Sequence, residues 1–289
     1  MNRKEQNIAV FEDTMNWIKH ESALSAAVKN SITHTVLYPA QQMPDLPEIS
    51  KSSKTKVTVT PQRTFEAAQD LLIRNPGSRA AVLNFASATN PGGSVTRGSS
   101  AQEEALCRCS TLYPCLTTPE LDKGYYQYHR KQQDVRYTDA CIYVPDIKII
   151  KTDTDSPKRL PETRWQAVDV ICCAAPNLRE RPYNKMNPGQ GKAIRVTPEE
   201  LLGLHRRRAY KIQILFNLLW ADLLHGVDRI PQTQISKPVM PMDLELPTYF
   251  HNTGCVNSIC TGKVYDLAQN PNGFHTVDWS KKPHASLAL

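Results

Sequence analysis

Two adjacent carboxylates follow a glycine-containing loop in this sequence. The loop spans residues 87–100 and contains Gly92 and Gly93, and the acids are Glu103 and Glu104. Adjacent glycines let a backbone approach a ligand closely and present its amides without side-chain obstruction. A helix that starts directly after such a loop favours negative charge at its N-terminus. The segment therefore suggests a site for a phosphorylated or polyhydroxylated ligand, bordered by two carboxylates.

A purely structural explanation of the same residues is also open. Ser100 and Glu103 have the spacing of a capping box, and Glu104 suits the first turn of a helix as a solvated acid. The glycine-containing segment can equally be a plain surface loop. Spacing alone favours this structural explanation of the two glutamates.

The elements around the loop predict an α/β domain. Residues 80–86 form an apolar run of strand length, as expected for a strand buried on both faces, and residues 101–113 follow the loop as a helix. Alternating strands and helices predict a mixed, largely parallel sheet. The remaining predicted elements are a helix at 8–28, a strand at 57–60, a helix capped by Thr60, strands at 140–144 (continued by 148–150) and 168–175, and a helix capped by Thr197.

Charge divides the chain unevenly. Residues 1–211 contain 30 Lys and Arg against 22 Asp and Glu, whereas residues 212–289 contain 5 against 6. The net charge of +7 suits an anionic partner. We expect an N-terminal helical extension with a linker at 1–55, a core domain at 56–211 and an atypical C-terminal segment at 212–289.

Composition excludes several classes of protein. With 289 residues, of which 40% are apolar, the chain is neither disordered throughout nor a disulfide-stapled miniprotein. Its longest apolar run, residues 212–224, contains Asn217 and Asp222 and is too short for a membrane span. The N-terminus shows no secretory signal, so we expect a cytoplasmic protein with free thiols and no membrane partner. We expect no metal site and no cofactor, because the spacing of the best cluster matches no standard zinc motif; that cluster is His251, Cys255, Cys260 and His275.

The loop and its glutamates resemble a known family. Leu83-Asn84-Phe85-Ala86, then Asn90-Pro91-Gly92-Gly93-Ser94, seven residues and Gln102-Glu103-Glu104 are similar to the microbial-type macrodomain poly(ADP-ribose) glycohydrolases. The signature of that family is three glycines, six to eight residues, and Gln-Glu-Glu. The resemblance continues through residues 106–113, 134–145 and 168–177 and covers roughly residues 57–211. It outweighs the structural explanation of the two glutamates.

The resemblance implies a macrodomain-like three-layer α/β/α fold and hydrolysis of the O-glycosidic bond of (poly)ADP-ribose, which releases ADP-ribose. Glu104 would be the catalytic acid/base, and Glu103 would bind the ribose hydroxyls beside the scissile bond. Asn90 would orient the distal ribose, while Gly92 and Gly93 would approach the diphosphate and that ribose. The full set of ligand-binding residues implied is Asn84, Phe85, Asn90, Gly92, Gly93, Ser94 and Gln102.

Two departures from the family pattern leave an alternative open. Ser94 replaces the third glycine, and it fits only if its φ is negative. After residue 211, no segment is similar to the loop that binds the diphosphate in the family. The absence of such a loop would impair catalysis. The alternative is therefore a reader module that binds ADP-ribose with weak or no hydrolysis. The expected partner is ADP-ribose or an ADP-ribosylated protein; a nucleic acid is expected only if it is itself ADP-ribosylated.

Overall fold

The computed structural model describes residues 2–42, 58–132, 134, 136–175, 208 and 211–212, together with three short strands near the C-terminus. Those strands are β6 (Lys263–Tyr265), β7 (Thr276–Asp278) and β8 (Ser286–Ala288). The predicted start of the helix at Thr197 and the cluster of His251, Cys255, Cys260 and His275 lie outside the described residues.

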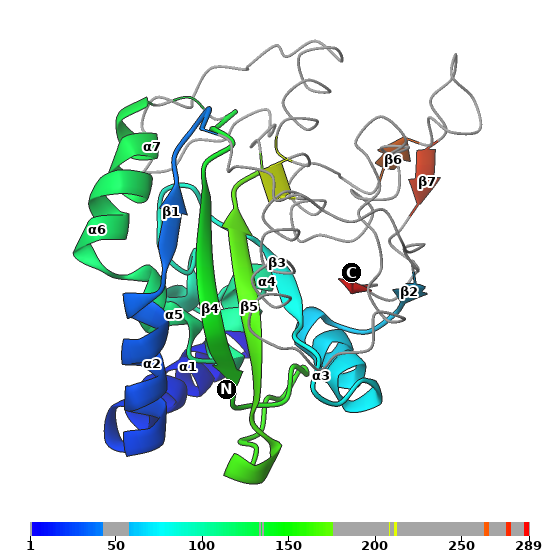
Figure 1. Cartoon of the computed structure of the whole chain (residues 1–289). Coiled ribbons are helices and arrows are strands. Elements are labelled where there is room, and N and C mark those ends of the chain that lie inside the picture. The colour runs from blue at the N-terminus through cyan, green and yellow to red at the C-terminus, as the bar shows by residue number, and fades with distance from the viewer. Residues whose placement is uncertain are drawn as a thin grey trace.

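A four-stranded mixed sheet forms the centre of the described structure, in the order β1-β4-β5-β3 (Figure 1). Its strands are β1 (Val36–Tyr38), β4 (Cys141–Ile149), β5 (Gln166–Cys173) and β3 (Ala81–Phe85). β3 runs parallel to β5, whereas β4 is antiparallel to both β5 and β1. The mixed α/β character predicted from the sequence is confirmed. Among these described strands, however, the sheet is not largely parallel, because β4 returns to β5 through a short connection without a crossover helix.

Helices cover this sheet, with α4 and α5 behind it in the view of Figure 1. The N-terminal helices are α1 (Arg3–His20) and α2 (Ser22–Thr33). The others are α3 (Thr64–Arg74), η1 (Val95–Arg97), α4 (Gln102–Cys109), α5 (Leu112–Leu116), α6 (Pro119–Leu121), η2 (Asp122–Tyr126), α7 (Gln127–Gln132) and η3 (Glu162–Arg164).

The helical prediction for residues 8–28 corresponds to two helices. Asn2 caps α1 through a capping box with Glu5, and the break falls at Glu21, whose φ of −96° and ψ of 114° are extended. Both helices pack into the same core as the sheet, with Phe11 and Leu24 among the buried side chains. The segment expected to be an extension therefore contributes to the core, and the boundary at residue 55 stays a prediction.

Two other helix boundaries differ from the sequence prediction. Thr60 does not cap a helix, because it belongs to strand β2 (Thr58–Thr60), which pairs with β8; α3 begins at Thr64 after Arg63. The helix predicted over residues 101–113 ends at Cys109, because Ser110 adopts an extended conformation and pairs with Ile149. α5 then resumes at Leu112.

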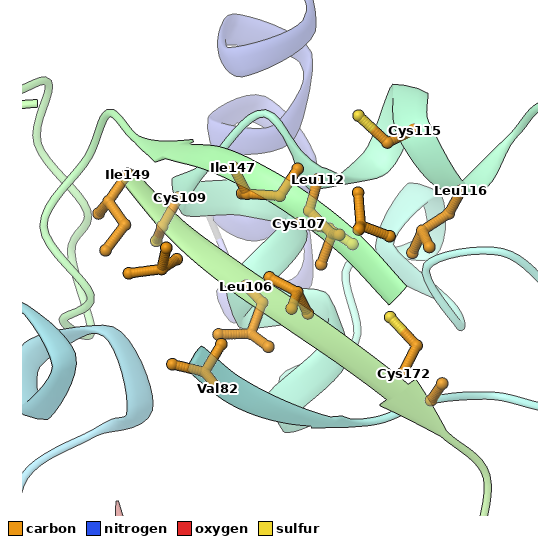
Figure 2. Packing of buried hydrophobic residues seen from close by; sticks show 14 of the residues in the cluster. Val82, Leu106, Cys107, Cys109, Leu112, Cys115, Leu116, Ile147, Ile149 and Cys172 are labelled. Carbon is orange, nitrogen blue, oxygen red and sulfur yellow. The ribbon is translucent and has the colours of Figure 1, made fainter. Parts of the chain in front are cut away.

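The main core lies between the sheet and α4 and α5. Figure 2 shows Leu106 and Leu112 facing Ile147 and Val82 across this layer. The opposite face of the sheet carries a smaller cluster, against which Ile212 packs. The six cysteines of the described part are buried and free, as predicted for Cys107, Cys109, Cys141, Cys172 and Cys173. Within the described ranges, none of the helices combines the length and apolar character that a bilayer crossing requires.

Candidate active site

The glycine loop leaves the carboxyl end of β3 and leads into α4. Gly92 and Gly93 have φ of 65° and 61°, which is the left-handed region that favours glycine. This conformation allows the chain to turn tightly, and the amide of Gly93 donates a hydrogen bond to the carbonyl of Asn90 at 3.0 Å. Ser94 has a φ of −115° and ψ of 31°. A serine therefore fits this position without backbone strain, although the family signature has glycine there.

Glu103 points beneath the loop and is only 4% exposed. Its Oε2 accepts a hydrogen bond of 2.7 Å from the amide of Ser87, sixteen residues earlier. The capping box with Ser100, which was the structural alternative for Glu103, does not form: Ala101 is the N-cap of α4 and makes no side-chain cap. The carboxyl of Glu103 is held by the loop instead of by its own helix end.

The pKa of Glu103 is raised to about 8, mainly because burial disfavours the charged carboxylate; the neighbouring charge of Glu104 contributes to the same rise. The hydrogen bond from the Ser87 amide and the nearby polar groups of Asn84 and Gly92 lower this pKa, but by less than burial raises it. Glu103 is therefore largely protonated near neutral pH.

Glu104 also turns toward the loop and is 6% exposed. Its Oε1 accepts a hydrogen bond of 2.8 Å from the amide of Ser94. Adjacent positions on a helix lie about 100° apart, so the two glutamates reach different parts of one loop. The structure thus brings both predicted catalytic acids under the loop, away from bulk water.

Both glycines sit where a side chain would collide. A Cβ at Gly93 would lie 2.6 Å from Oε1 of Glu104 and 3.1 Å from Oε2 of Glu103. A Cβ at Gly92 would lie 2.6 Å from the ring of Tyr113. The loop can cover the carboxylates closely only because these two positions have no side chain.

The other predicted ligand residues lie around this centre. Gln102 joins the start of α4 to β3: its Oε1 accepts from the amide of Phe85 at 2.9 Å, and its Nε2 donates to the carbonyl of Leu83 at 2.9 Å. Asn84 is fully buried, and its Nδ2 donates to Sγ of Cys172 at 3.3 Å. Through these contacts the side chains of Gln102 and Asn84 bind neighbouring groups of the protein. Their roles in ligand binding stay predictions.

Asn90, in the first half of the loop, and Phe85, the last residue of β3, are both partly buried. The side chain of Asn90 donates to Oγ1 of Thr89 at 3.2 Å. Arg130, from α7, donates to the carbonyl of Thr89 at 2.6 Å and fixes this half of the loop. The ligand contacts predicted for Asn90 and Phe85 also stay predictions.

Sequence reasoning missed residues that approach the loop from other elements. Tyr113 lies against Gly92, Asn7 of α1 binds the end of the loop, and Arg108 donates to the carbonyl of Ser99 at 2.5 Å. A signal for Asn7 existed, because it shares the buried stripe of α1 with Phe11, Thr14 and Ile18, where an asparagine is out of place.

The aromatic and basic segment at residues 125–131 belongs mainly to the core. Tyr125 and Tyr126 are fully buried, and burial lowers the pKa of His129 to about 4, which keeps its ring neutral. Among the described residues, no group of three His, Cys, Asp or Glu side chains is placed to hold a metal ion.

The raised pKa of Glu103 predicts a pH-dependent stability. Between the ordinary value of 4.5 and about 8, the folded protein keeps a proton that the unfolded chain has released. This group should therefore lower the free energy of unfolding by up to about 1.4 kcal/mol for each pH unit of rise in that window. Denaturant unfolding from pH 5 to pH 9 should show the slope in the wild type and lose it in Glu103→Gln.

The exposed Glu12 of α1 supplies the matched control. Glu12→Gln should retain the pH slope of the wild type. Equal slopes in the wild type and Glu103→Gln would contradict the assignment of the buried proton to Glu103.

Comparison with known proteins agrees with this geometry. Residues 6–152 match the model of the family described as microbial-type PARG, catalytic domain. A search of curated proteins finds no match.

Among solved structures, poly(ADP-ribose) glycohydrolase from Thermomonospora curvata is similar at 28% identity and a TM-score of 0.61, over 77% of each chain. The enzyme from Deinococcus radiodurans, solved in complex with ADP-ribose, is 33% identical with a TM-score of 0.52, over 66% of this chain and 71% of that one. The family model covers half of the chain, and it begins within α1 and includes the loop and both glutamates. This chain belongs to the microbial-type poly(ADP-ribose) glycohydrolase catalytic-domain family.

Proposed function

We propose that this protein hydrolyses the O-glycosidic bond of (poly)ADP-ribose and releases ADP-ribose, with Glu104 as the general acid/base. One observation carries the proposal: Glu103 and Glu104 lie buried under a glycine loop whose amides hold both carboxyls. The neighbouring structures of the family are poly(ADP-ribose) glycohydrolases, one of them solved with the inhibitor ADP-HPD bound.

The chemistry follows from the needs of the bond. The departing ribose oxygen requires a proton as its bond to the anomeric carbon breaks, and that carbon gains oxocarbenium character. In its protonated form Glu104 supplies this proton and becomes a carboxylate, which then accepts a proton from the attacking water and so returns to its starting state. The hydrogen bond from the Ser94 amide holds one carboxyl oxygen of Glu104 in place and leaves the other for the substrate.

Glu103 has a different part in this scheme. Within the described residues, its Oε1 is buried without a hydrogen-bond partner, whereas its Oε2 is held by Ser87. A buried polar atom without a partner is costly, so a bound hydroxyl group would stabilise it. We assign Oε1 of Glu103 to a ribose hydroxyl beside the scissile bond.

In this proposal the main role of the glycine loop is to hold the carboxyls of Glu103 and Glu104 in place. The amides of Ser87 and Ser94 donate to the carboxyls, and those of Gly93 and Val95 close turns within the loop. We keep Gly92 and Gly93 as the positions where the diphosphate and the distal ribose approach. We base this assignment on glycine having no side chain, which lets a ligand approach the backbone closely.

The reader alternative is weakened at Ser94. A serine was expected to fit there only if its φ is negative, and its φ of −115° meets that condition; its Oγ accepts a hydrogen bond of 2.7 Å from Arg97. The contact of this side chain with a ligand stays a prediction. The other reason for the reader alternative concerns residues after 211, most of which lie outside the described ranges.

Two measurements on the wild-type protein test the proposal. Calorimetric titration with ADP-ribose should show binding, and incubation with poly(ADP-ribose) should release ADP-ribose, detected by chromatography. Binding without release would favour the reader module. Absence of both would overturn the assignment of an ADP-ribose site.

We further propose ADP-ribosylated protein as the physiological partner and the cytoplasm as the compartment. The buried free thiols of the described residues are consistent with a reducing environment. A nucleic-acid substrate enters this proposal only if it carries ADP-ribose.

A further inference from the structure

The N-terminal helix α1 binds the far end of the glycine loop through Asn7. The Nδ2 of Asn7 donates to the carbonyl of Gly98 at 3.0 Å, and Oγ of Ser100 and the carbonyl of Ser99 lie 3.2 and 3.5 Å away. Asn7 is 3% exposed, although asparagine is usually a surface residue. Its burial is explained by these acceptors, because a buried amide needs hydrogen-bond partners.

The helix and the loop approach each other too closely for any other residue at position 98. Gly98 has a φ of 75°, and a Cβ there would lie 2.3 Å from the carbonyl oxygen of Lys4, which is backbone of α1. Helix and loop are therefore in direct backbone contact beside Asn7. A second donor fixes the same place, since Arg108 donates to the carbonyl of Ser99 at 2.5 Å.

A short series of hydrogen bonds connects this contact to the catalytic acid. The amide of Ser99 donates to the carbonyl of Ser94 at 3.3 Å, and the amide of Arg97 donates to the same carbonyl at 2.9 Å. The amide of Ser94 in turn donates to Oε1 of Glu104 at 2.8 Å. The position of Ser94 therefore depends on the segment that α1 holds.

We propose that Asn7 is a positioning residue for catalysis: by anchoring Gly98 and Ser99 to α1, it fixes the Ser94 amide that orients Glu104. This inference rests on the proposed glycohydrolase function and extends the active site to a helix that sequence analysis placed outside the core domain.

Loss of the Asn7 contact would free the carbonyl of Gly98, leave the carbonyl of Ser99 to Arg108 alone, and let residues 94–99 shift. A displacement of about 1 Å at a catalytic group can cost about 100-fold in rate. Of the residues predicted to meet the ligand, only Ser94 lies in this segment, so we expect kcat to fall by about 10- to 100-fold and KM to change by less than about threefold.

Thr14 offers a matched control on the same helix. It is fully buried, and its Oγ1 donates to the carbonyl of Arg108 at 2.6 Å, at the end of α4 away from Ser94. Asn7→Leu and Thr14→Val each replace a buried polar side chain of α1 by an apolar one of similar shape. Both should lower Tm, but only Asn7→Leu should lower kcat.

The experiment measures Tm, ADP-ribose affinity by calorimetry, and kcat and KM for ADP-ribose release in the wild type and both variants. Asn7→Ala, which removes the amide without introducing branched methyl groups, serves if Asn7→Leu does not fold. A wild-type kcat in either Asn7 variant, or an equal loss of kcat in Thr14→Val, would overturn the positioning role. Failure of the proposed function is distinguishable, because the wild type itself would then release no ADP-ribose.

Discussion

Replacing Glu104 by glutamine is expected to lower kcat for ADP-ribose release by about 10²- to 10⁴-fold. Glutamine has the shape of glutamate, and its side-chain oxygen can still accept the hydrogen bond that the Ser94 amide donates to Oε1. What the amide cannot do is transfer a proton to the departing ribose oxygen. Binding of ADP-ribose should therefore stay within a few-fold of the wild type by calorimetry.

Glu66 provides the matched control for this substitution. Like Glu104, it lies in the first turn of a helix and accepts a hydrogen bond from a backbone amide, that of Arg63 at 3.2 Å, but it is exposed on α3. Glu66→Gln should leave kcat unchanged. Turnover retained in Glu104→Gln would remove Glu104 as the acid and shift attention to Glu103.

The location of the site could be predicted from the sequence because it depends on patterns within short segments of the chain. The apolar run that forms β3, the glycine pair after it and the two acids at the start of α4 stand in the order predicted. β3 is not buried equally on both faces, because half-buried and buried positions alternate along it. Its apolar residues nevertheless indicate a strand, and positive φ favours glycine, so both features can be recognised in short segments of the sequence.

The hydrogen bonds of the acids could not be predicted in this way. Spacing alone suggested Ser100 as the capping partner of Glu103, whereas in the structure Glu103 accepts a hydrogen bond from the amide of Ser87. The choice depends on how tightly the loop folds over α4, and that depends on Arg130, Tyr113 and other residues from elements that follow later in the chain. Local patterns carry no information about such contacts.

The role of the N-terminal helices was underestimated for a related reason. Residues 1–55 were expected to form an extension with a linker, yet α1 buries Phe11 and Ile18 in the common core and places Asn7 against the loop. An apolar helical stripe shows that a helix packs against another element, but it does not identify that element. The asparagine within that stripe is the feature that could have indicated a specific contact.

Replacing Gly93 by alanine is the second change expected to have a large effect. A Cβ at this position would lie 2.6 Å from Oε1 and 3.1 Å from Cδ of Glu104, and the positive φ of 61° disfavours any L side chain. Glu104 is buried and hydrogen-bonded to Ser94, so its carboxyl can move away only by breaking that bond. We expect kcat to fall by about 10- to 100-fold, through displacement of the acid.

Gly77→Ala separates this steric effect from the cost of the backbone conformation. Gly77 has a φ of 83° and is exposed in the turn after α3, where a Cβ would meet none of the described atoms within 4 Å. Left-handed strain should cost each variant about 1–2 kcal/mol of stability, measured by denaturant unfolding, and Gly93→Ala should lose more because of the collision with Glu104. Only Gly93→Ala should lose activity. If Gly93→Ala keeps the wild-type kcat, catalysis does not depend on the position that Ser94 and Gly93 give to Oε1 of Glu104, and it must then tolerate a carboxyl group that is free to move.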